Sequence, residues 1–497
     1  MNPVDLILQL GTWGQHHHRE VLGGLIAAPV LIGGAQLLRR HRRGASTVMG
    51  SARWATPHEV RKAGLTAQHG VVVGHLNGRR LHDDSNTHVL LIGPTRSWKG
   101  RSVIIPTLLT WRHSALIFDP KDGENADVTA PWRARLGRVE LFTPCRAPHA
   151  CLNVLDTIRL KTIREFGDAQ LIAQSLTAPE KMAYESPTSL HFRELAAMLL
   201  TATFLHVCYT ARRKSLAGAW SFLTQEHASL ADCLTTMATT AHSSHGVHQA
   251  ITSMTTAINN IVGDRELSSI WSTAIRPLLL YNDPMIAAST DTSTLDVEAL
   301  QYGTAPLSLY LIAPSPMALE RLHPLYRVIL DVAMTRLQEH PVRTWQQRLL
   351  FCGDEFTWYG YTRVIDKGVS VMAGYGQKAL LVTQDIPMLE EVFGQRSGIW
   401  GNTDLKIFHA PTNDLTAERI STTILGRGTI EHPVESKQEG LFGQRSVSFQ
   451  HVARSLLTTD EVMELDPRFQ IVRLGVKPIL CQKVDYLTDP SFQRRTA

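Results

Sequence analysis

The fold is decided by the stretch Leu91-Ile92-Gly93-Pro94-Thr95-Arg96-Ser97-Trp98-Lys99-Gly100-Arg101-Ser102. An apolar run, His88 to Ile92, precedes the loop and another, Val103 to Leu109, follows it, which predicts a strand, a tight loop and a helix. Such a loop directs backbone N–H groups and a helix N-terminus at one point, and this suits the phosphates of a nucleotide. Lys99 would then reach the β- and γ-phosphates.

The loop departs in two places from the common phosphate-binding pattern G-x-x-x-x-G-K-[ST]. Trp98 stands where the second glycine is usual, and Gly100 follows the lysine in place of a hydroxyl residue. A left-handed backbone costs a non-glycine residue roughly 1–2 kcal/mol. Trp98 must therefore take a strained conformation or turn its indole away from the phosphates. On this loop alone, an ordinary strand-to-helix turn is as compatible with the sequence as a phosphate site.

Strand-like and helical segments alternate along the remaining chain. Apolar runs that predict strands lie at 71–73, 113–119, 136–144, 306–312, 347–352, 378–383, 404–409 and 470–472. A helix is predicted at 317–338, and residues 165–298 are largely helix-compatible, as in Leu190 to Thr210. The pattern predicts one α/β core that is split by an all-helical insertion.

Polar residues follow three of the predicted strands, where open α/β sheets bind their ligands. The run 113–119 leads into DPKDGEN (119–125), Asp354-Glu355 follows 347–352, and Gln384 follows 378–383. Beside a phosphate loop, Asp354 would hold the Mg²⁺ that bridges the phosphates, and Glu355 would activate the attacking water. Gln384 would sense the γ-phosphate through its amide. The combined set is far more specific than any one member.

Composition limits the class of protein only loosely. The 497 residues, 43% of them apolar, are enough for two or three domains and argue against wholesale disorder. The net charge of +5 permits an acidic partner such as DNA without requiring one. The scattered cysteines indicate free thiols in a reducing compartment, and His16–His18 and the triplet His242, His245 and His248 are interpreted as polar flanks or faces rather than metal ligands.

The N-terminal region contains a candidate membrane helix. Val21 to Leu38 has eighteen uncharged residues, just enough to span a bilayer. Four arginines follow it, at positions 39, 40, 42 and 43, and the positive-inside rule places the rest of the chain in the cytoplasm. A buried Gly/Ala-rich helix is the alternative, and a cleaved signal peptide fits less well because the charges follow the apolar run.

Eight segments resemble TraG-like coupling proteins of type IV secretion and conjugation, which are P-loop DNA-transfer ATPases. The resemblance covers nearly all of the chain after residue 44. The matching segments are GSARWA (50–55), HVLLIGPTRSWKG (88–100), DPKDGEN (119–125), PLSLYLIAPSPMALERLHPLYRVIL (306–330), DEF (354–356), AGYGQKALLVTQD (373–385), LTAERIS (415–421) and ARSLLTTDEVMEL (453–465).

The resemblance implies a membrane-anchored, hexameric ATPase of the bacterial inner membrane, with most of the chain in the cytoplasm. Its fold would be a RecA-like P-loop nucleotide-binding core with an inserted all-helical domain and an N-terminal membrane helix. The expected domains are an anchor (1–43), the nucleotide-binding domain (44–164 and 299–497) and the helical insertion (165–298). ATP and Mg²⁺ are the expected cofactors. The expected partners are a relaxase–DNA complex or effector proteins, non-specifically bound DNA and a type IV secretion channel.

The resemblance also assigns residue roles. Lys99 is the phosphate lysine, Asp354 and Glu355 are the acidic pair with Asp354 on the metal, and Gln384 is the motif glutamine. Nucleotide-binding residues are Gly93, Pro94, Thr95, Arg96, Ser97, Trp98, Lys99, Gly100 and Arg101. Arg419 and Arg454 are arginine-finger candidates because they lie in matched segments.

Three departures separate this sequence from the family pattern. Trp98 replaces the family's glycine, DPKDGEN is one residue longer than the family's D-x-K-G-E, and one membrane helix is evident where many relatives have two. The lack of a hydroxyl residue after Lys99 is normal for this branch. Trp98 keeps open a second function, a docking scaffold that has lost ATPase activity. A chromosome-type DNA pump is a third, which the matched segments outside the loop disfavour.

Overall fold

The protein is described by a computed structural model that covers residues 48–496 except 147–149, 182–185, 226–228, 245, 262, 342–343, 438–444 and 476. The chain divides into two compact units. The larger unit comprises Trp54–Ile424 and the residues from Leu457 onward, and it carries the candidate site. The smaller unit includes the described residues up to Arg53 and the segment Leu425–Leu456.

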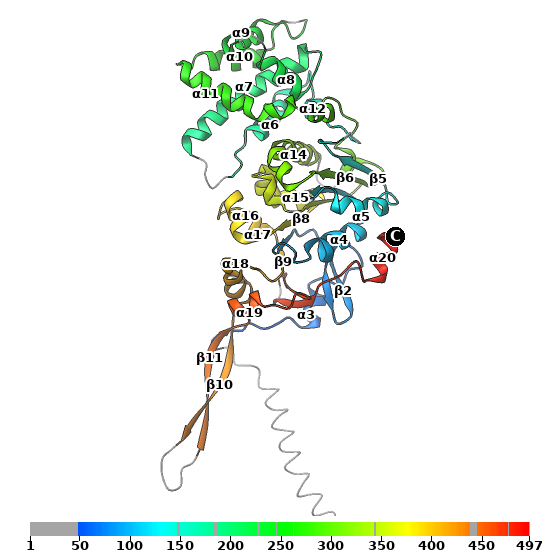
Figure 1. Cartoon of the computed structure of the whole chain (residues 1–497), viewed down its shortest axis with the longest axis vertical. Helices are drawn as coiled ribbons and strands as arrows, with labels where there is room; N and C mark the ends of the chain where they lie inside the picture. The colour runs from blue at the N-terminus through cyan, green and yellow to red at the C-terminus, as the bar shows by residue number, and fades with distance from the viewer. Residues whose placement is uncertain are drawn as a thin grey trace, which may run out of the picture. The chain divides into compact units, whose positions relative to one another are not determined.

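An eleven-stranded mixed sheet forms the centre of the larger unit (Figure 1). Its strand order is β2-β1-β13-β12-β9-β3-β8-β7-β4-β6-β5. The strands are β1 (Val71–Leu76), β2 (Arg79–Asp83), β3 (Val89–Ile92), β4 (Ser114–Asp119), β5 (Arg138–Phe142), β6 (Leu307–Ile312), β7 (Leu349–Gly353), β8 (Gln377–Thr383), β9 (Leu405–Phe408), β12 (Phe469–Arg473) and β13 (Ile479–Gln482).

The seven strands from β9 to β5 in this order are parallel, and the other four extend the sheet in antiparallel pairs. Every residue of β3, β4, β6, β7 and β8 is buried. Continuous apolar runs of this kind are typical of parallel strands with helices on both faces.

Helices cover both faces of the sheet. The helices α4 (Ile105–Thr110) and α5 (Glu124–Arg133) lie on one side, and α15 (Val369–Met372), α16 (Ile386–Phe393) and α17 (Ile399–Asn402) lie on the other (Figure 1). Crossovers between parallel strands are almost always right-handed, so a reversal in strand order moves the helices to the opposite face. This reversal lies between β3 and β4, where β8 and β7 are inserted.

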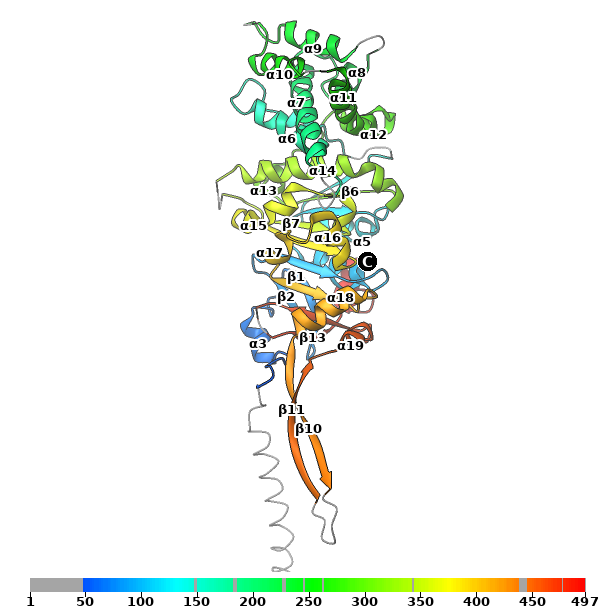
Figure 2. The same ribbon diagram turned by 90° about the vertical axis from the view of Figure 1, so that its left-hand side faces the viewer.

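The described chain between β5 and β6 forms helices and no strand of the sheet (Figure 2). They are the 3₁₀-helix η2 (Val154–Thr157), α6 (Glu165–Thr177), α7 (Pro187–Thr210), α8 (Leu216–Leu223), α9 (Leu230–Thr239), α10 (Gln249–Asn259), α11 (Asp264–Leu278), η4 (Leu279–Asn282), α12 (Pro284–Thr290) and α13 (Ala299–Tyr302). Helix α6 packs on α14 (Pro316–Gln338) of the core. There Ser175 Oγ donates to the buried Asp331 carboxylate at 2.6 Å, and the fully buried Arg327 donates to the carbonyl of Leu176.

The smaller unit contains a two-stranded antiparallel ribbon, β10 (Arg427–Lys437) and β11 (Arg445–Ser455). Ser51 pairs with Gly428 beside it. Ile430 is paired with Val452 across the ribbon, and each side chain is 40% exposed.

The eight segments predicted as strands and the predicted apolar strand before the loop are confirmed as β1, β3, β4, β5, β6, β7, β8, β9 and β12. The helices predicted at 190–210 and 317–338 are confirmed as parts of α7 and α14. The strands β2, β13, β10 and β11 were not predicted. The candidate membrane segment Val21–Leu38 lies outside the described residues.

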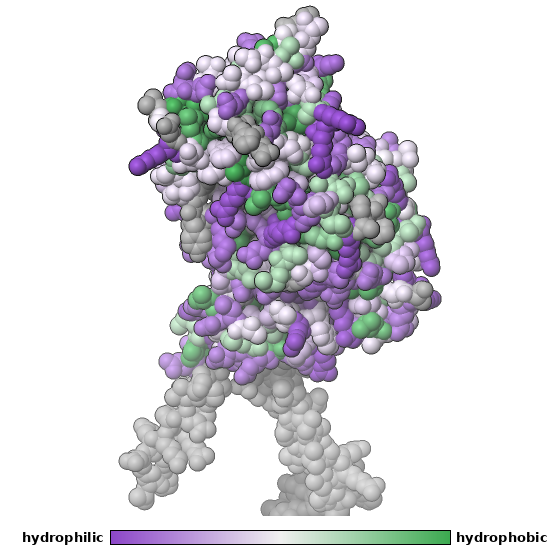
Figure 3. Space-filling view, turned by 45° about the horizontal axis from the view of Figure 1, so that its top comes forward, coloured by the Kyte–Doolittle hydropathy of each residue, from purple (hydrophilic) through white to green (hydrophobic). Residues whose placement is uncertain are grey.

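None of the described helices has the length and apolar character needed to cross a bilayer. On the face drawn in Figure 3, hydrophobic residues are scattered among polar ones.

Candidate nucleotide-binding site

The predicted site residues meet at one edge of the sheet. The strands β3, β8, β7 and β4 are consecutive parallel neighbours, so their carboxyl ends lie side by side. The phosphate-type loop follows β3, Gln384 follows β8, Asp354-Glu355 follows β7 and Asp119 ends β4. Residues from four distant parts of the sequence are thereby brought to one place, as expected for a ligand site at this edge.

The loop after β3 is closely packed. A Cβ atom on Gly93 would lie 2.7 Å from Ser97 Oγ and 2.8 Å from His409 Cβ, so a larger residue does not fit. Arg96 and Trp98 have positive φ angles of 64° and 73°, in the left-handed region. The helical segment that follows begins as a π-turn, η1 (Gly100–Ile104), and continues into α4.

Of the two alternatives that the sequence offered, the structure shows the strained backbone for Trp98. Its backbone is left-handed, and its side chain is 38% exposed, with the Arg101 guanidinium 4.7 Å from the ring centroid. Arg101 in turn forms two hydrogen bonds with the carboxylate of Asp485. Lys483 Nζ donates to the carbonyl of Ser97 at 3.0 Å. The segment 483–485 therefore braces the outside of the loop, and the indole lies against this brace.

Lys99 points into the loop. Its Nζ donates to the carbonyls of Gly93 at 2.7 Å and Pro94 at 3.2 Å and lies 3.1 Å from Glu355 Oε1. The side chains of Lys99 and Glu355 are 6% and 1% exposed. The ammonium group thus lies where a phosphate loop holds an anion, and a carboxylate already neutralises its charge.

Asp354 and Glu355 are buried carboxylates with raised pKa values. Burial raises the pKa of both, and Lys121 and Lys99 respectively oppose the rise. Glu355 has a φ of 48°, which turns its side chain back toward the loop, and its Oε2 has no hydrogen-bond partner in the described structure. A strained backbone and an unpaired buried carboxylate oxygen are typical of functional sites.

Sequence reasoning missed Asn125 and the role of Asp119. Asn125 Nδ2 donates to Asp354 Oδ2 at 3.2 Å. Asp119 Oδ2 accepts hydrogen bonds from the backbone N–H groups of Asn125 and Ala126, each at 2.9 Å, while its Oδ1 has no described partner. Burial, with a smaller contribution from the Asp354 charge, raises the pKa of Asp119 to about 7. Both residues belong to DPKDGEN, whose placement at a strand end was the available signal.

Gln384 and His409 complete the rim of the site. Thr95 Oγ1 donates to Gln384 Oε1 at 3.4 Å, so the amide lies beside the phosphate-type loop. His409 is hydrogen-bonded to Ser97 Oγ at 3.2 Å and to Gln470 Oε1 at 3.0 Å. Burial, followed by the charge of Lys483, lowers the pKa of His409 well below its usual value, which keeps the imidazole neutral.

The donor set fits a magnesium nucleotide. Asp119, Asp354 and Glu355 supply buried carboxylate oxygens, two of them without described partners, and oxygen ligands are those that Mg²⁺ prefers. Lys99 and the N–H groups at the start of a helical segment suit phosphate oxygens.

The arginine-finger candidate Arg419 is engaged by residues other than those of this site. Arg419 is paired with Glu390 and lies over the Trp400 ring at 5.0 Å, and Arg454 is on β11 of the smaller unit. Of the histidine triplet, His242 is hydrogen-bonded to His206 at 2.9 Å and His248 to Glu165 at 2.8 Å, and His245 lies outside the described residues.

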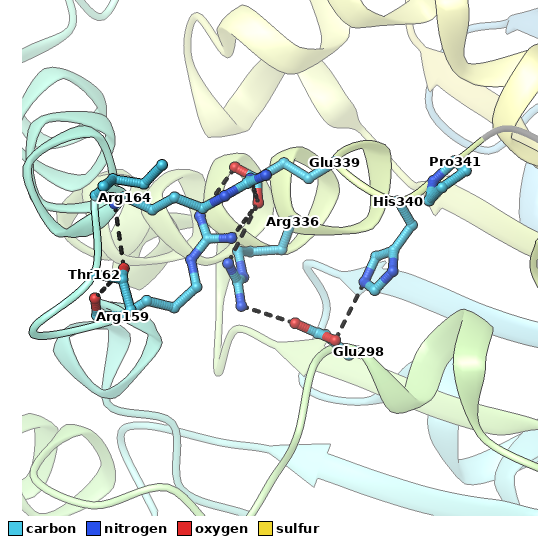
Figure 4. Close-up of a pocket in the computed structure, with 9 residues that line it drawn as sticks. Arg159, Thr162, Arg164, Glu298, Arg336, Glu339, His340 and Pro341 are labelled. Carbon is cyan, nitrogen blue, oxygen red and sulfur yellow. Dashed lines mark hydrogen bonds and ion pairs between the residues drawn. The ribbon is translucent and has the colours of Figure 1, made fainter.

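A separate cavity of about 460 Å³ lies between the start of α6 and the end of α14 (Figure 4). Its three arginines are paired with three carboxylates: Arg159 lies 2.7 Å from Glu339 and is also paired with Asp168, Arg164 lies 3.1 Å from Glu339, and Arg336 lies 2.8 Å from Glu298. This network joins the helical segment to the core and has no surplus charge for a ligand.

The fold and the site together are those of an α/β protein with a candidate nucleotide-binding site, and comparison with known proteins identifies its family. The chain belongs to the type IV secretory system conjugative DNA transfer family, which matches residues 53–497. It is a TraG-like type IV coupling protein. It is 30% identical to the conjugal transfer protein TraG of Escherichia coli over 560 residues, which cover all of this chain and 87% of that protein. It is 26% identical to the VirD4 protein of Rhizobium radiobacter over 469 residues, which cover 90% of this chain and 65% of that protein.

The fold is that of the plasmid coupling protein TrwB. The TrwB complex with the non-hydrolysable ATP analogue ADPNP matches with a TM-score of 0.65 and 16% identity, covering 87% of this chain and 93% of TrwB. The TrwB complex with ADP and Mg²⁺ matches with a TM-score of 0.62 and 14% identity, covering 89% and 96%.

Proposed function

We propose that this chain is a membrane-anchored coupling ATPase that recruits a relaxase–DNA complex or effector proteins and delivers them to a type IV secretion channel. The observation that carries the proposal is the meeting of Lys99, Asp354 and Glu355 at the carboxyl ends of adjacent strands. Nucleotide-bound structures of TrwB, which has the same fold, support ATP and Mg²⁺ as the ligands.

In this proposal, each residue acts through a contact that its position allows. Lys99 exchanges Glu355 and the loop carbonyls for phosphate oxygens, and Asp354, held by Asn125, binds the metal. Glu355, released from Lys99, accepts a proton from the attacking water. Gln384 and Thr95 lie together at the loop and report on the γ-phosphate. Bound Mg²⁺ would neutralise charge that develops on the phosphates.

The proposal extends to assembly and location. Motor sites of this fold class lie between neighbouring subunits, so a homohexamer is the proposed state, with the arginine finger coming from a neighbour. The segment 21–38 and the arginines after it are the proposed anchor in the bacterial inner membrane, with the bulk of the chain in the cytoplasm.

A docking scaffold with impaired or lost ATPase activity is the second candidate function. Two observations favour it. Trp98 keeps a left-handed backbone that costs a non-glycine residue roughly 1–2 kcal/mol. Lys99 already has a buried carboxylate as its partner, with which phosphate must compete.

Nucleotide binding and hydrolysis by the full-length protein test the proposal. Binding of a fluorescent ATP analogue and release of phosphate are measured for the unchanged protein, for Lys99→Ala and for Lys62→Ala, which changes an exposed lysine on α3 (Pro57–Lys62). We expect activity that Lys99→Ala abolishes and Lys62→Ala leaves unchanged. The scaffold would be favoured if the unchanged protein still binds its cargo but binds ATP without hydrolysing it. The same holds if it binds its cargo but neither binds nor hydrolyses ATP.

A further inference from the structure

An arginine cluster lies on the surface formed by the ends of α4 and α5 and by the C-terminal helix α20 (Pro490–Thr496). We call it the arginine patch. Its members are Arg80, Arg112, Arg135, Arg494 and Arg495. It lies away from the nucleotide site, because α4 and α5 start at the carboxyl ends of the strands and finish at the opposite edge of the sheet. The run from Gly100 to Thr110 is about 15 Å long at the rise of a helix.

The members of the patch are close to one another. The guanidinium groups of Arg135 and Arg495 lie 5.6 Å and 5.1 Å from the centroid of the same Trp132 ring. Burial lowers the pKa of Arg495, and the positive charges of Arg80, Arg112 and Arg494 lower it further. These charges are therefore near enough to repel one another.

Structural roles account for two of the five arginines. Arg495 Nη1 donates to the carbonyl of Leu109 at 2.6 Å, which caps the end of α4. Arg80 is paired with Asp489 and lies 4.2 Å from the centroid of the Phe492 ring.

The other three arginines have no such explanation. Arg112, Arg135 and Arg494 are exposed and form no ion pair with any acidic side chain in the described part of the chain. Clustered like charges destabilise a fold unless an anion offsets them. Arginine is the side chain best suited to phosphate, because its planar group can donate two parallel hydrogen bonds.

We propose that the arginine patch binds the phosphate backbone of single-stranded DNA, with Trp132 contributing a stacking surface among the charges. Basic surfaces with an interleaved aromatic side chain are typical of single-strand binding. The inference rests on the proposed DNA-transfer function and specifies where the DNA binds. A strand held there touches the end of the helix whose beginning carries Lys99, so one rigid element joins the two sites.

The test compares two triple variants of the full-length protein in detergent. The patch variant is Arg112→Gln/Arg135→Gln/Arg494→Gln, and the matched control is Arg61→Gln/Arg265→Gln/Arg396→Gln, which removes the same charge from exposed positions elsewhere. Affinity for a fluorescein-labelled oligothymidylate is measured by anisotropy over a range of KCl concentrations. The salt slope is the slope of the logarithm of the binding constant against the logarithm of the KCl concentration. Each lost phosphate contact should reduce its magnitude by about 0.7, so we expect a reduction of about 2 for the patch variant and little change for the control.

Each outcome has a defined meaning. Equal slopes for the patch variant and the control would overturn the assignment of the surface and leave DNA transfer in place. No DNA binding by the unchanged protein at low salt would overturn both. Polyglutamate that binds as tightly as the oligothymidylate would assign the patch to an acidic protein partner instead. Trp132→Leu should weaken binding of the single strand about tenfold and leave a duplex probe unaffected, and equal losses on both probes would contradict the choice of single-stranded DNA.

Discussion

The guanidinium group of Arg101 lies over the indole ring of Trp98, 4.7 Å from the ring centroid. Arg101 is held in place by the carboxylate of Asp485. The tryptophan in this phosphate-type loop is thus packed against a side chain that Asp485 holds, whereas Lys99 contacts the loop carbonyls and Glu355.

The first prediction separates the strain at Trp98 from the bulk of its indole. Trp98→Gly should raise ATP turnover about tenfold, a change of about 1.4 kcal/mol, because glycine adopts the left-handed conformation freely. Trp98→Ala should give no gain, because alanine keeps the strain and the indole is already partly exposed and packed against Arg101. Equal gains from both substitutions in a phosphate-release assay would show that bulk matters, and no gain from glycine would refute the argument from strain.

The second prediction concerns the brace behind the loop. Asp485→Asn should weaken ATP binding several-fold, because Arg101 loses the carboxylate that fixes it against Trp98. In a Trp98→Gly background the same change should have little effect, since the indole no longer needs support. Asp466→Asn, which breaks an exposed pair with Arg468, is the matched control. Titration with a fluorescent ATP analogue measures all four variants, and an undiminished effect in the glycine background would contradict the coupling.

The third prediction separates binding from hydrolysis. Glu355→Gln removes the charge that holds Lys99 away from phosphate, so ATP should bind at least as tightly as in the unchanged protein. Turnover should fall at least about 100-fold, because loss of a general base typically costs 10²–10⁴ in rate. Equilibrium binding and single-turnover hydrolysis are the measurements. Weaker binding with normal turnover would assign Glu355 a purely structural role.

The fourth prediction is a pH dependence of stability that arises from Asp119. Its pKa is about 7 in the folded protein and 3.8 in its ordinary state, so between these values the folded protein binds the proton more tightly. The protonated Asp119 therefore contributes fully to the free energy of unfolding below about pH 4. This contribution is lost as the pH rises toward 7, by about 1.4 kcal/mol per pH unit.

Asp119→Asn should remove this dependence of stability on pH between pH 4 and 7. The protein should still fold, since the amide oxygen can accept the same hydrogen bonds from the backbone N–H groups of α5. Thermal midpoints between pH 5 and 7 in nucleotide-free buffer give the comparison. Asp127→Asn on the same helix should keep the slope of the unchanged protein. A slope unaffected by Asp119→Asn would mean that this carboxyl group is ionised throughout.

The fifth prediction concerns the N-terminal segment. The full-length protein should remain in the membrane fraction after lysis without detergent, with its C-terminus accessible from the cytoplasmic side. Deletion of residues 21–43 should release it, because this removes the apolar run and the arginines that follow it. Fractionation and protease accessibility of spheroplasts are the measurements. A full-length protein that stays soluble would contradict the anchor.

The parallel part of the sheet could be predicted because its strands are short continuous apolar runs between turn signals. The strands β10 and β11 lack such runs, because antiparallel strands with exposed residues do not need them. Residues 446–450 alternate serine or glutamine with valine or phenylalanine, and this short period-two pattern was the overlooked signal for β11. The domain boundaries proposed from the sequence stay predictions.

The site was partly predictable for a related reason. Lys99, Asp354 and Gln384 stand at strand ends, so their spacing along the sequence revealed them. The brace formed by Lys483 and Asp485 could not be predicted, because it depends on contacts between segments 386 and 384 residues apart. The pairing of Lys99 with Glu355 likewise depends on the left-handed turn at Glu355, which no local pattern indicates.

The brace has a consequence for biosynthesis. Lys483 is translated 386 residues after Ser97, whose carbonyl it binds. At ~5–20 residues per second, the ribosome needs roughly 20–80 s to cover that distance. During this interval the nascent loop lacks its brace, and for most of it the loop also lacks the neighbouring strands β8 and β9, which end at residues 383 and 408. We therefore expect that the candidate nucleotide site becomes able to bind its ligand only near the end of translation.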